Sequence, residues 1–141
     1  MTKNARPVGR MPKRHQRMDW RNKENWRQHP ELSLRSTEYV IGDPTTGNAL
    51  LLLFAEYGPE ATVNVHSHLV DYASIVLSGS IEVTRRIEEV GSIRLVSAGT
   101  AYGPLRAGPE GCTVLDVFAL GEKSRDAIKA QYLGGPDEAT L

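Results

Sequence analysis

Two histidines one residue apart, His66 and His68, are the residues of this chain best suited to chemistry. They end a strand-like run that begins at Ala61, and residues i and i+2 of a β-strand point to the same face. Both imidazoles should therefore converge on one point, as metal ligation or paired acid–base chemistry requires. Asn64 falls on the same face, so we predict that it contributes to substrate binding beside them.

Short strands separated by turn residues must position this pair. From residue 36 onward the chain reads as short strand-like runs separated by turn residues such as Gly, Pro, Asn and Asp, and no alternation of strands with helices is visible. This pattern predicts an all-β sandwich or barrel. The predicted strands are Thr37–Ile41, Ala49–Glu56, Ala61–His66, Ala73–Leu77, Ile81–Arg86, Ser92–Val96 and Thr113–Ala119.

The predicted barrel occupies residues 36–120 and is flanked by two smaller segments. Residues 1–35 read as a flexible basic arm followed by a lead-in to the first strand. Residues 121–141 read as a short C-terminal helix and tail, with the helix expected from Glu122 to Leu133 because glycines and a proline follow it.

The spacing around the two histidines resembles the first motif of the cupins, a superfamily of small antiparallel jelly-roll barrels. That motif has a glutamate between the histidine pair and a final glycine. This chain keeps the spacing but has Tyr72 where the glutamate is expected, and the leading glycine is displaced to Gly58. The matching stretch is His66-x-His68-x3-Tyr72-x6-Gly79.

A second stretch resembles the second cupin motif, again without gaps. Ser97 replaces the expected proline, Tyr102 replaces the third histidine, and Arg106 replaces the asparagine. The stretch is Gly91-x5-Ser97-x-Gly99-x2-Tyr102-x3-Arg106. The resemblance implies a cupin barrel, with a fainter likeness to cupins of the acetylacetone-dioxygenase type. Arg106 is a candidate for binding an anionic substrate.

The resemblance also implies a divalent metal, which cupins hold through three histidines and one glutamate. Only His66 and His68 of those four ligands are present here, so they are the metal candidates for Fe, Mn, Ni or Zn. A tyrosine binds a metal well only as phenolate, and its usual pKa is about 10. Two imidazoles and two phenols would hold a redox metal poorly, so a site without metal stays open.

Two kinds of chemistry follow from these residues. With a metal, the pair would polarise a carbonyl group or activate oxygen, as in a diketone-cleaving dioxygenase. Without one, His66, His68, Tyr72 and Tyr102 would form an acid–base pocket for isomerisation, elimination or cyclisation of a carbonyl-containing substrate. We favour the second, and a non-catalytic ligand-binding barrel is the third hypothesis.

Composition sets the expectations for partners and compartment. The 141 residues are 40% hydrophobic and have zero formal net charge, which is typical of a soluble globular protein. Residues 1–30 hold nine Lys/Arg against two Asp/Glu, and we favour a subunit contact over nucleic-acid binding for this basic arm. Open strand edges favour a homodimer. With Cys112 as the only cysteine and no membrane-length apolar run, we expect a cytoplasmic protein.

Overall fold

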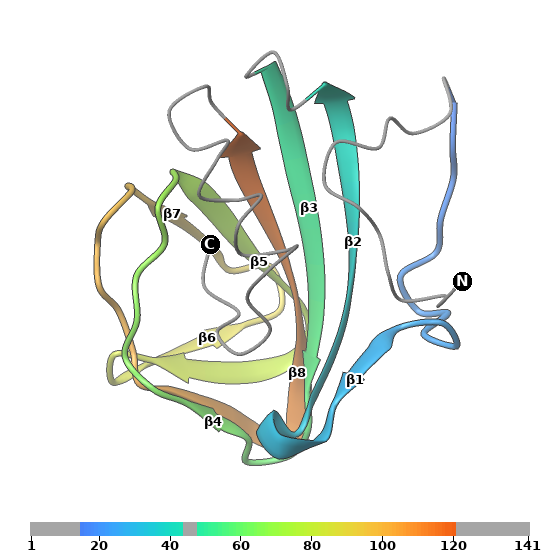
Figure 1. Cartoon of the computed structure of the whole chain (residues 1–141). Helices are drawn as coiled ribbons and strands as arrows, with labels where there is room; N and C mark the ends of the chain where they lie inside the picture. The colour runs from blue at the N-terminus through green and yellow to red at the C-terminus, as the bar shows by residue number, and fades with distance from the viewer. Residues whose placement is uncertain (1–14, 44–47, 121–141) are drawn as a thin grey trace.

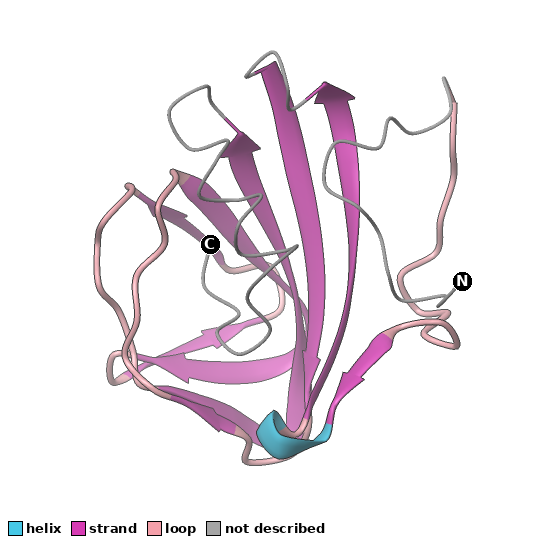
Figure 2. Ribbon diagram, viewed as in Figure 1, coloured by secondary structure: helices cyan, strands magenta, loops and turns pink. Residues whose placement is uncertain are grey.

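The computed structural model describes residues 15–43 and 48–120, and within them almost every element is a strand (Figures 1 and 2). The strands are β1 (Arg27–His29), β2 (Leu34–Asp43), β3 (Asn48–Tyr57), β4 (Thr62–Val63), β5 (Tyr72–Val83), β6 (Arg86–Glu89), β7 (Ile93–Val96) and β8 (Leu105–Leu120). A single turn of 3-10 helix, η1 (Pro30–Leu32), joins β1 to β2.

All strand pairs are antiparallel, and they form one curved sheet of eight strands. The order along the sheet is β1-β2-β3-β8-β5-β6, with β4 paired to β8 and β7 paired to β5. Long strands β2, β3 and β8 lie side by side, and β4 and β6 close the lower end of the molecule in Figure 1. The all-β class predicted from the turn pattern is therefore confirmed.

Strands β5 and β8 are longer than the sequence pattern predicts. Ala73–Leu77 and Ile81–Arg86 were expected as two strands, but β5 spans the first and continues into the second as far as Val83. Its pairing with β8 shifts register on either side of Gly79. A Cβ atom on Gly79 would lie 2.0 Å from the backbone oxygen of Gly111. The glycines that looked like turn residues instead allow two strands to pass close together at a bulge.

The predicted strand Ala61–His66 is wrong in extent, because only Thr62–Val63 is a strand there. The short partner segment of β8 pairs with these two residues alone, and the chain then leaves the sheet. The predicted strand Ile81–Arg86 is also wrong in extent, because Thr84 and Arg85 both have positive φ and form the turn that joins β5 to β6.

Two clusters of buried side chains fill the interior. The first lies toward the end of the barrel that β4 closes, and it includes Ala55, Val76, Ile81 and Val114. The second includes Leu51, Val70, Tyr72 and Phe118. Tyr102 packs against both clusters, so its side chain lies at the junction between them.

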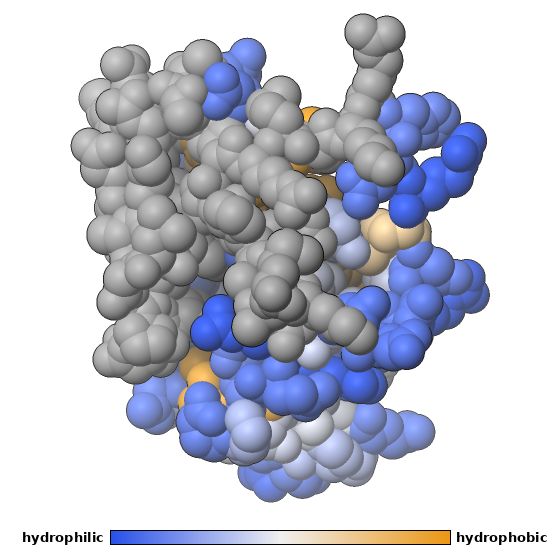
Figure 3. Space-filling view, turned by 45° about the vertical axis from the view of Figure 1, so that its right-hand side comes forward, coloured by the Kyte–Doolittle hydropathy of each residue, from blue (hydrophilic) through white to orange (hydrophobic). Residues whose placement is uncertain are grey.

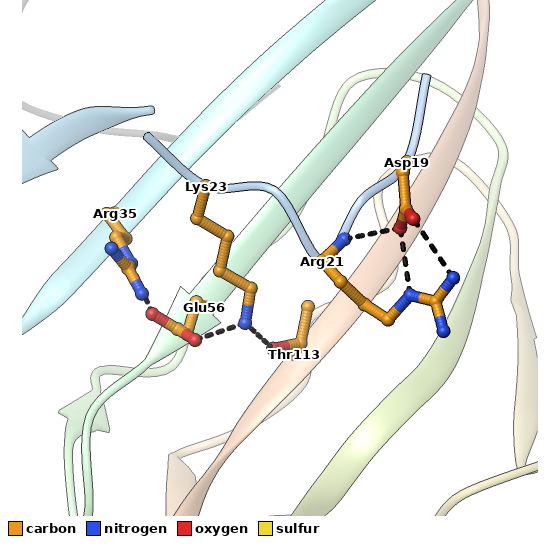
Figure 4. Close-up of polar contacts among 6 residues, drawn as sticks. All are labelled: Asp19, Arg21, Lys23, Arg35, Glu56 and Thr113. Atoms are coloured by element: carbon orange, nitrogen blue, oxygen red, sulfur yellow. Dashed lines mark hydrogen bonds and ion pairs between the residues drawn. The ribbon is translucent and has the colours of Figure 1, made fainter. Parts of the chain in front are cut away.

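The lead-in before β1 is fastened to the outside of the sheet. The Trp26 side chain is buried, and its ring centroid lies 6.1 Å from that of Phe54. Glu56 accepts hydrogen bonds from both Lys23 and Arg35, and Lys23 also donates to the Thr113 hydroxyl at 3.2 Å (Figure 4). These contacts tie the lead-in to β3 and β8.

The surface of the described residues is mostly hydrophilic on the face shown in Figure 3, with small apolar patches between the charged side chains. No helix in the segments 15–43 and 48–120 is long and apolar enough to cross a membrane. The predicted helix Glu122–Leu133 and the first fourteen residues of the basic arm lie outside the described residues.

Candidate functional site

The residues of the two sequence motifs meet where two loops are bonded to each other. The backbones of His66 and Tyr102 exchange two hydrogen bonds, of 3.1 and 3.0 Å, in an isolated β-bridge. The Gly99 backbone N–H donates to the His68 carbonyl at 2.8 Å, and the Ala98 N–H donates to the Asp71 carboxylate at 2.8 Å. The second motif is thereby held against the first.

The Tyr102 hydroxyl lies between the two imidazoles and contacts both. Its oxygen is 2.9 Å from Nε2 of His66 and 2.7 Å from Nε2 of His68. The two imidazole centroids are 5.0 Å apart and nearly perpendicular. Regular strand alternation was expected to bring the histidines together, but the strand ends at Val63 and the bridge to Tyr102 does so instead.

The proton positions in this cluster follow from one further contact. Nδ1 of His66 is 2.8 Å from the Asn64 carbonyl oxygen, which can only accept, so Nδ1 must donate. In neutral His66, Nε2 is then an acceptor, and the Tyr102 hydroxyl donates to it. The Tyr102 oxygen in turn accepts from Nε2–H of His68. Each neutral imidazole is therefore held in a different tautomer.

Tyr72 forms the inner wall of the cluster. Its ring centroid lies 4.7 Å from that of His68 and 5.1 Å from that of Phe118, and the residue is buried. Its hydroxyl has no hydrogen bond of full geometry with any residue that the structure describes. Tyr102 and Arg94 are nevertheless close enough to lower the pKa of this hydroxyl. Burial outweighs both and raises the pKa of Tyr72 above its usual value.

Tyr102 stays protonated at neutral pH. Burial is the largest cause that raises the pKa of its phenol, and the neighbouring Tyr72 raises it further. A neutral phenol can donate one hydrogen bond and accept others, so Tyr102 can link the two imidazoles without carrying charge.

A polar cavity adjoins the cluster on the other side of Tyr102. The space open to the centre of a water-sized molecule is about 20 Å³, so the cavity admits only small ligands. Its polar lining comprises Ser74, Arg94 and Asp116, together with Tyr57, Ser92 and Glu88, and Tyr102 is the shared wall. The Glu88 carboxylate accepts a hydrogen bond from Ser92. The Arg94 guanidinium lies over the Tyr102 ring, 4.8 Å from the centroid.

Arg94 and Asp116 were not among the predicted site residues, although the sequence contains a signal for Asp116. The run Val114–Leu120 is apolar apart from Asp116, and strand alternation places Asp116 on the same face as Val114 and Phe118, which are buried. A lone carboxylate in the inward phase of a core strand is unusual and marks a candidate site.

The Asp116 carboxyl lies deep although the residue as a whole is partly exposed. Its Oδ1 is buried and has no hydrogen-bond partner among the residues described. Burial raises the pKa of Asp116 to about 6, against a hydrogen bond from Ser74 and the charge of Arg94, which both lower it. Asp116 therefore titrates close to neutral pH.

Two predicted substrate-binding residues lie apart from this cluster. The Asn64 residue is exposed, and its backbone carbonyl rather than its side chain contacts His66. Arg106 is exposed on β8 and forms an ion pair with Glu60 at 2.8 Å. The structure thus brings together His66, His68, Tyr72 and Tyr102, and it leaves the side chains of Asn64 and Arg106 outside.

The donor set does not fit the divalent metal that cupins commonly hold. Within residues 15–43 and 48–120, no group of three or more His, Cys, Asp or Glu side chains is placed to share an ion. The Nε2 atoms of His66 and His68 both bond the Tyr102 hydroxyl, whose raised pKa opposes the phenolate form that a metal would need. We therefore derive no step through a metal.

Comparison with known proteins shows which solved structures share this architecture. No family model and no curated protein matches the chain. Among solved structures, an RmlC-like cupin from Shewanella frigidimarina superposes with a TM-score of 0.53 at 16% identity, covering 66% of this chain and 81% of that one. KdgF from a Halomonas species gives a TM-score of 0.53 at 16% identity, covering 72% and 91%.

A third similar structure is oxalate decarboxylase from Bacillus subtilis. It matches with a TM-score of 0.52 at 21% identity, over 63% of this chain but only 25% of that chain. At such identities the likeness concerns the fold and not the activity. The structural matches agree with the spacing of the two motifs and the antiparallel sheet, and the chain has the cupin fold.

Proposed function

We propose that this chain is a small-molecule enzyme that moves a proton on a carbonyl-containing substrate, as an isomerase, lyase or cyclase does. The observation that carries the proposal is the Tyr102 hydroxyl held between two imidazole nitrogens, at 2.9 and 2.7 Å, beside a polar cavity. Tyr102, which contacts both imidazoles, thus also lines a space in which a small polar group fits.

Each member of the cluster has a role that its tautomer permits. A substrate carbonyl oxygen that enters the cluster would take the hydrogen bonds of Tyr102 O–H and His68 Nε2–H. Nε2 of His66 would then lose its hydrogen bond and become available as a base. The contact between His66 Nδ1–H and the Asn64 carbonyl keeps the lone pair on Nε2 and fixes the ring.

The proton transfer itself balances without a further reagent. His66 Nε2 takes a proton from the carbon next to the carbonyl, and the C–H electron pair moves to form the enolate. The two donors stabilise the negative oxygen of that enolate, which is where charge develops. Return of the proton to another carbon gives isomerisation, and departure of a leaving group gives elimination.

A non-catalytic ligand-binding barrel is the second candidate. It is favoured by the completeness of the cluster, because the Tyr102 hydroxyl already bonds both imidazoles and a substrate must displace these bonds. The diketone-cleaving dioxygenase hypothesis has less support, because the described donor set lacks the ligands that would retain a redox metal.

Proton exchange in deuterium oxide tests the proposal without knowledge of the product. Pyruvate, acetoacetate, acetylacetone and dihydroxyacetone would be incubated with the protein, and loss of the α-proton signals followed by NMR. We expect exchange above the buffer rate for at least one compound, and a drop of roughly 100-fold in Tyr102→Phe. Tyr39→Phe is the matched control, since Tyr39 packs on Phe54 away from the cluster.

Two outcomes would count against the proposal. Equal exchange rates in the parent and in Tyr102→Phe would remove the hydroxyl from the mechanism. An absence of exchange with every compound, together with measurable binding of one of them, would favour the binding-only barrel.

A further inference from the structure

Three polar side chains lie on one rung of the barrel interior. Ser74 on β5 pairs with Arg94 on β7 on one side and with Asp116 on β8 on the other. Directly opposed residues of an antiparallel pair project to the same face, and all three side chains line the same cavity. The rung therefore presents a hydroxyl, a guanidinium and a carboxyl to one small space.

The two charged side chains of this rung form no ion pair with the described residues around them. The ion pairs among the described residues involve neither Arg94 nor Asp116. Arg94 instead lies over the Tyr102 ring, and the buried Oδ1 of Asp116 has no partner among the residues in the described ranges. A buried acceptor left without a donor costs stability, so its retention points to a ligand that supplies the donor.

We propose that the Ser74–Arg94–Asp116 rung binds a hydroxylated carboxylate: Arg94 takes the carboxylate group, and Oδ1 of Asp116 accepts from the neighbouring hydroxyl. The guanidinium offers paired N–H donors that match a carboxylate, and an ionised carboxyl accepts from a hydroxyl in a charge-assisted bond. The raised pKa of Asp116 supports the same site, because a carboxyl that is costly to ionise gains most from an added donor.

The position of Tyr102 connects this rung to the reacting cluster. Tyr102 contacts Arg94 through its ring and both histidines through its hydroxyl. The inference rests on the proposed function in one respect: it makes the rung the recognition end for a substrate whose carbonyl reaches Tyr102. The implied substrate class is a small hydroxy acid that also carries a carbonyl group.

Three probes of equal size separate the two recognition elements. Glycolate carries the carboxylate and the hydroxyl, propionate lacks only the hydroxyl, and glycolamide lacks only the charge. Each would be titrated at pH 7.5 and constant ionic strength, with binding followed through the Arg94 Nε–H signal in a 15N-resolved NMR spectrum. We expect glycolate to bind about tenfold more tightly than either other probe, since one charged hydrogen bond has that value.

The variants assign the effect to the rung. Arg94→Gln should weaken glycolate binding about tenfold or more, and Arg106→Gln, which removes an exposed arginine paired with Glu60, should leave it unchanged. Asp116→Asn should remove most of the preference for glycolate over propionate. Circular dichroism and melting curves confirm that each variant is folded before titration.

The inference is overturned if propionate and glycolate bind alike, if no probe moves the Arg94 signal, or if Arg106→Gln has the same effect as Arg94→Gln. Its failure is separable from that of the proposed function. The probe pattern without any proton exchange would leave the recognition rung standing and defeat the proton-transfer proposal. Proton exchange without probe binding would do the reverse.

Discussion

Replacing Asp116 by Asn should stabilise the protein above pH 6, although it removes a charged group from the interior. The carboxyl shares its cavity with Ser74 on β5, Glu88 on β6, Arg94 on β7 and the two tyrosines Tyr57 and Tyr102. Burial is the dominant influence on its pKa, so the ionised form is disfavoured in the folded state. Asparagine has nearly the same shape and never ionises.

The size of the effect follows from the two pKa values. The Asp116 pKa is about 6 in the folded protein against an ordinary value of 3.8. Because each pKa unit corresponds to about 1.4 kcal/mol, the carboxylate lowers the free energy of unfolding by at most about 3 kcal/mol once both states are ionised. The penalty is absent below pH 3.8, grows between 3.8 and 6, and is complete above 6.

Urea unfolding of both proteins at several pH values between 4.5 and 8 measures this difference. We expect Asp116→Asn to gain about 2 kcal/mol on the parent over that range, because most of the penalty develops within it. Glu110→Gln is the control, since Glu110 is an exposed carboxylate on the same strand. If Asp116→Asn is less stable than the parent, and by the same amount at pH 8 as at pH 4.5, the Asp116 carboxyl carries no such ionisation penalty.

Three further predictions concern the frame and the metal question. Glu56→Gln should cost about 1 kcal/mol in urea unfolding, because the charged acceptor shared by Lys23 and Arg35 is lost, and no change would mean that these pairs add nothing. Gly79→Ala should lower the melting temperature far more than Gly91→Ala. Both glycines have positive φ, but only a Cβ at Gly79 would collide with the Gly111 backbone. Equal effects of the two substitutions would contradict this close approach. After incubation with Fe, Mn, Ni or Zn and desalting, mass spectrometry should find well below one metal ion per chain; stoichiometric metal that is lost in His66→Ala would restore the metal hypotheses.

The sequence predicted the parts of the fold that depend on local pattern. The short strand-like runs and the turn residues between them sufficed for the all-β class. The motif spacing predicted that Tyr72 and Tyr102 lie beside the histidines. Strand lengths were less predictable. Gly79 and Gly111 are residues typical of turns, but in this fold they lie where the backbones of β5 and β8 pass close to each other.

The polar rung could not be predicted, for a different reason. Arg94 and Asp116 are distant in the sequence, and only the pairing of β7 and β8 with the same residue of β5 brings them together. Long-range register of this kind is not contained in local periodicity. Arg106 is the reverse case. Its motif position made it a candidate for binding an anionic substrate, but the neighbouring Glu60 holds its side chain at the surface.

The tautomers of the two histidines are the sharpest test of the proposed His–Tyr–His cluster. A long-range 1H–15N spectrum of the neutral imidazoles distinguishes Nδ1–H from Nε2–H for each ring. We expect Nδ1–H for His66, which donates to the Asn64 carbonyl, and Nε2–H for His68, which donates to the Tyr102 oxygen. Finding the Nδ1–H form for both, with both Nε2 lone pairs directed at one point as in a metal site, would contradict this arrangement.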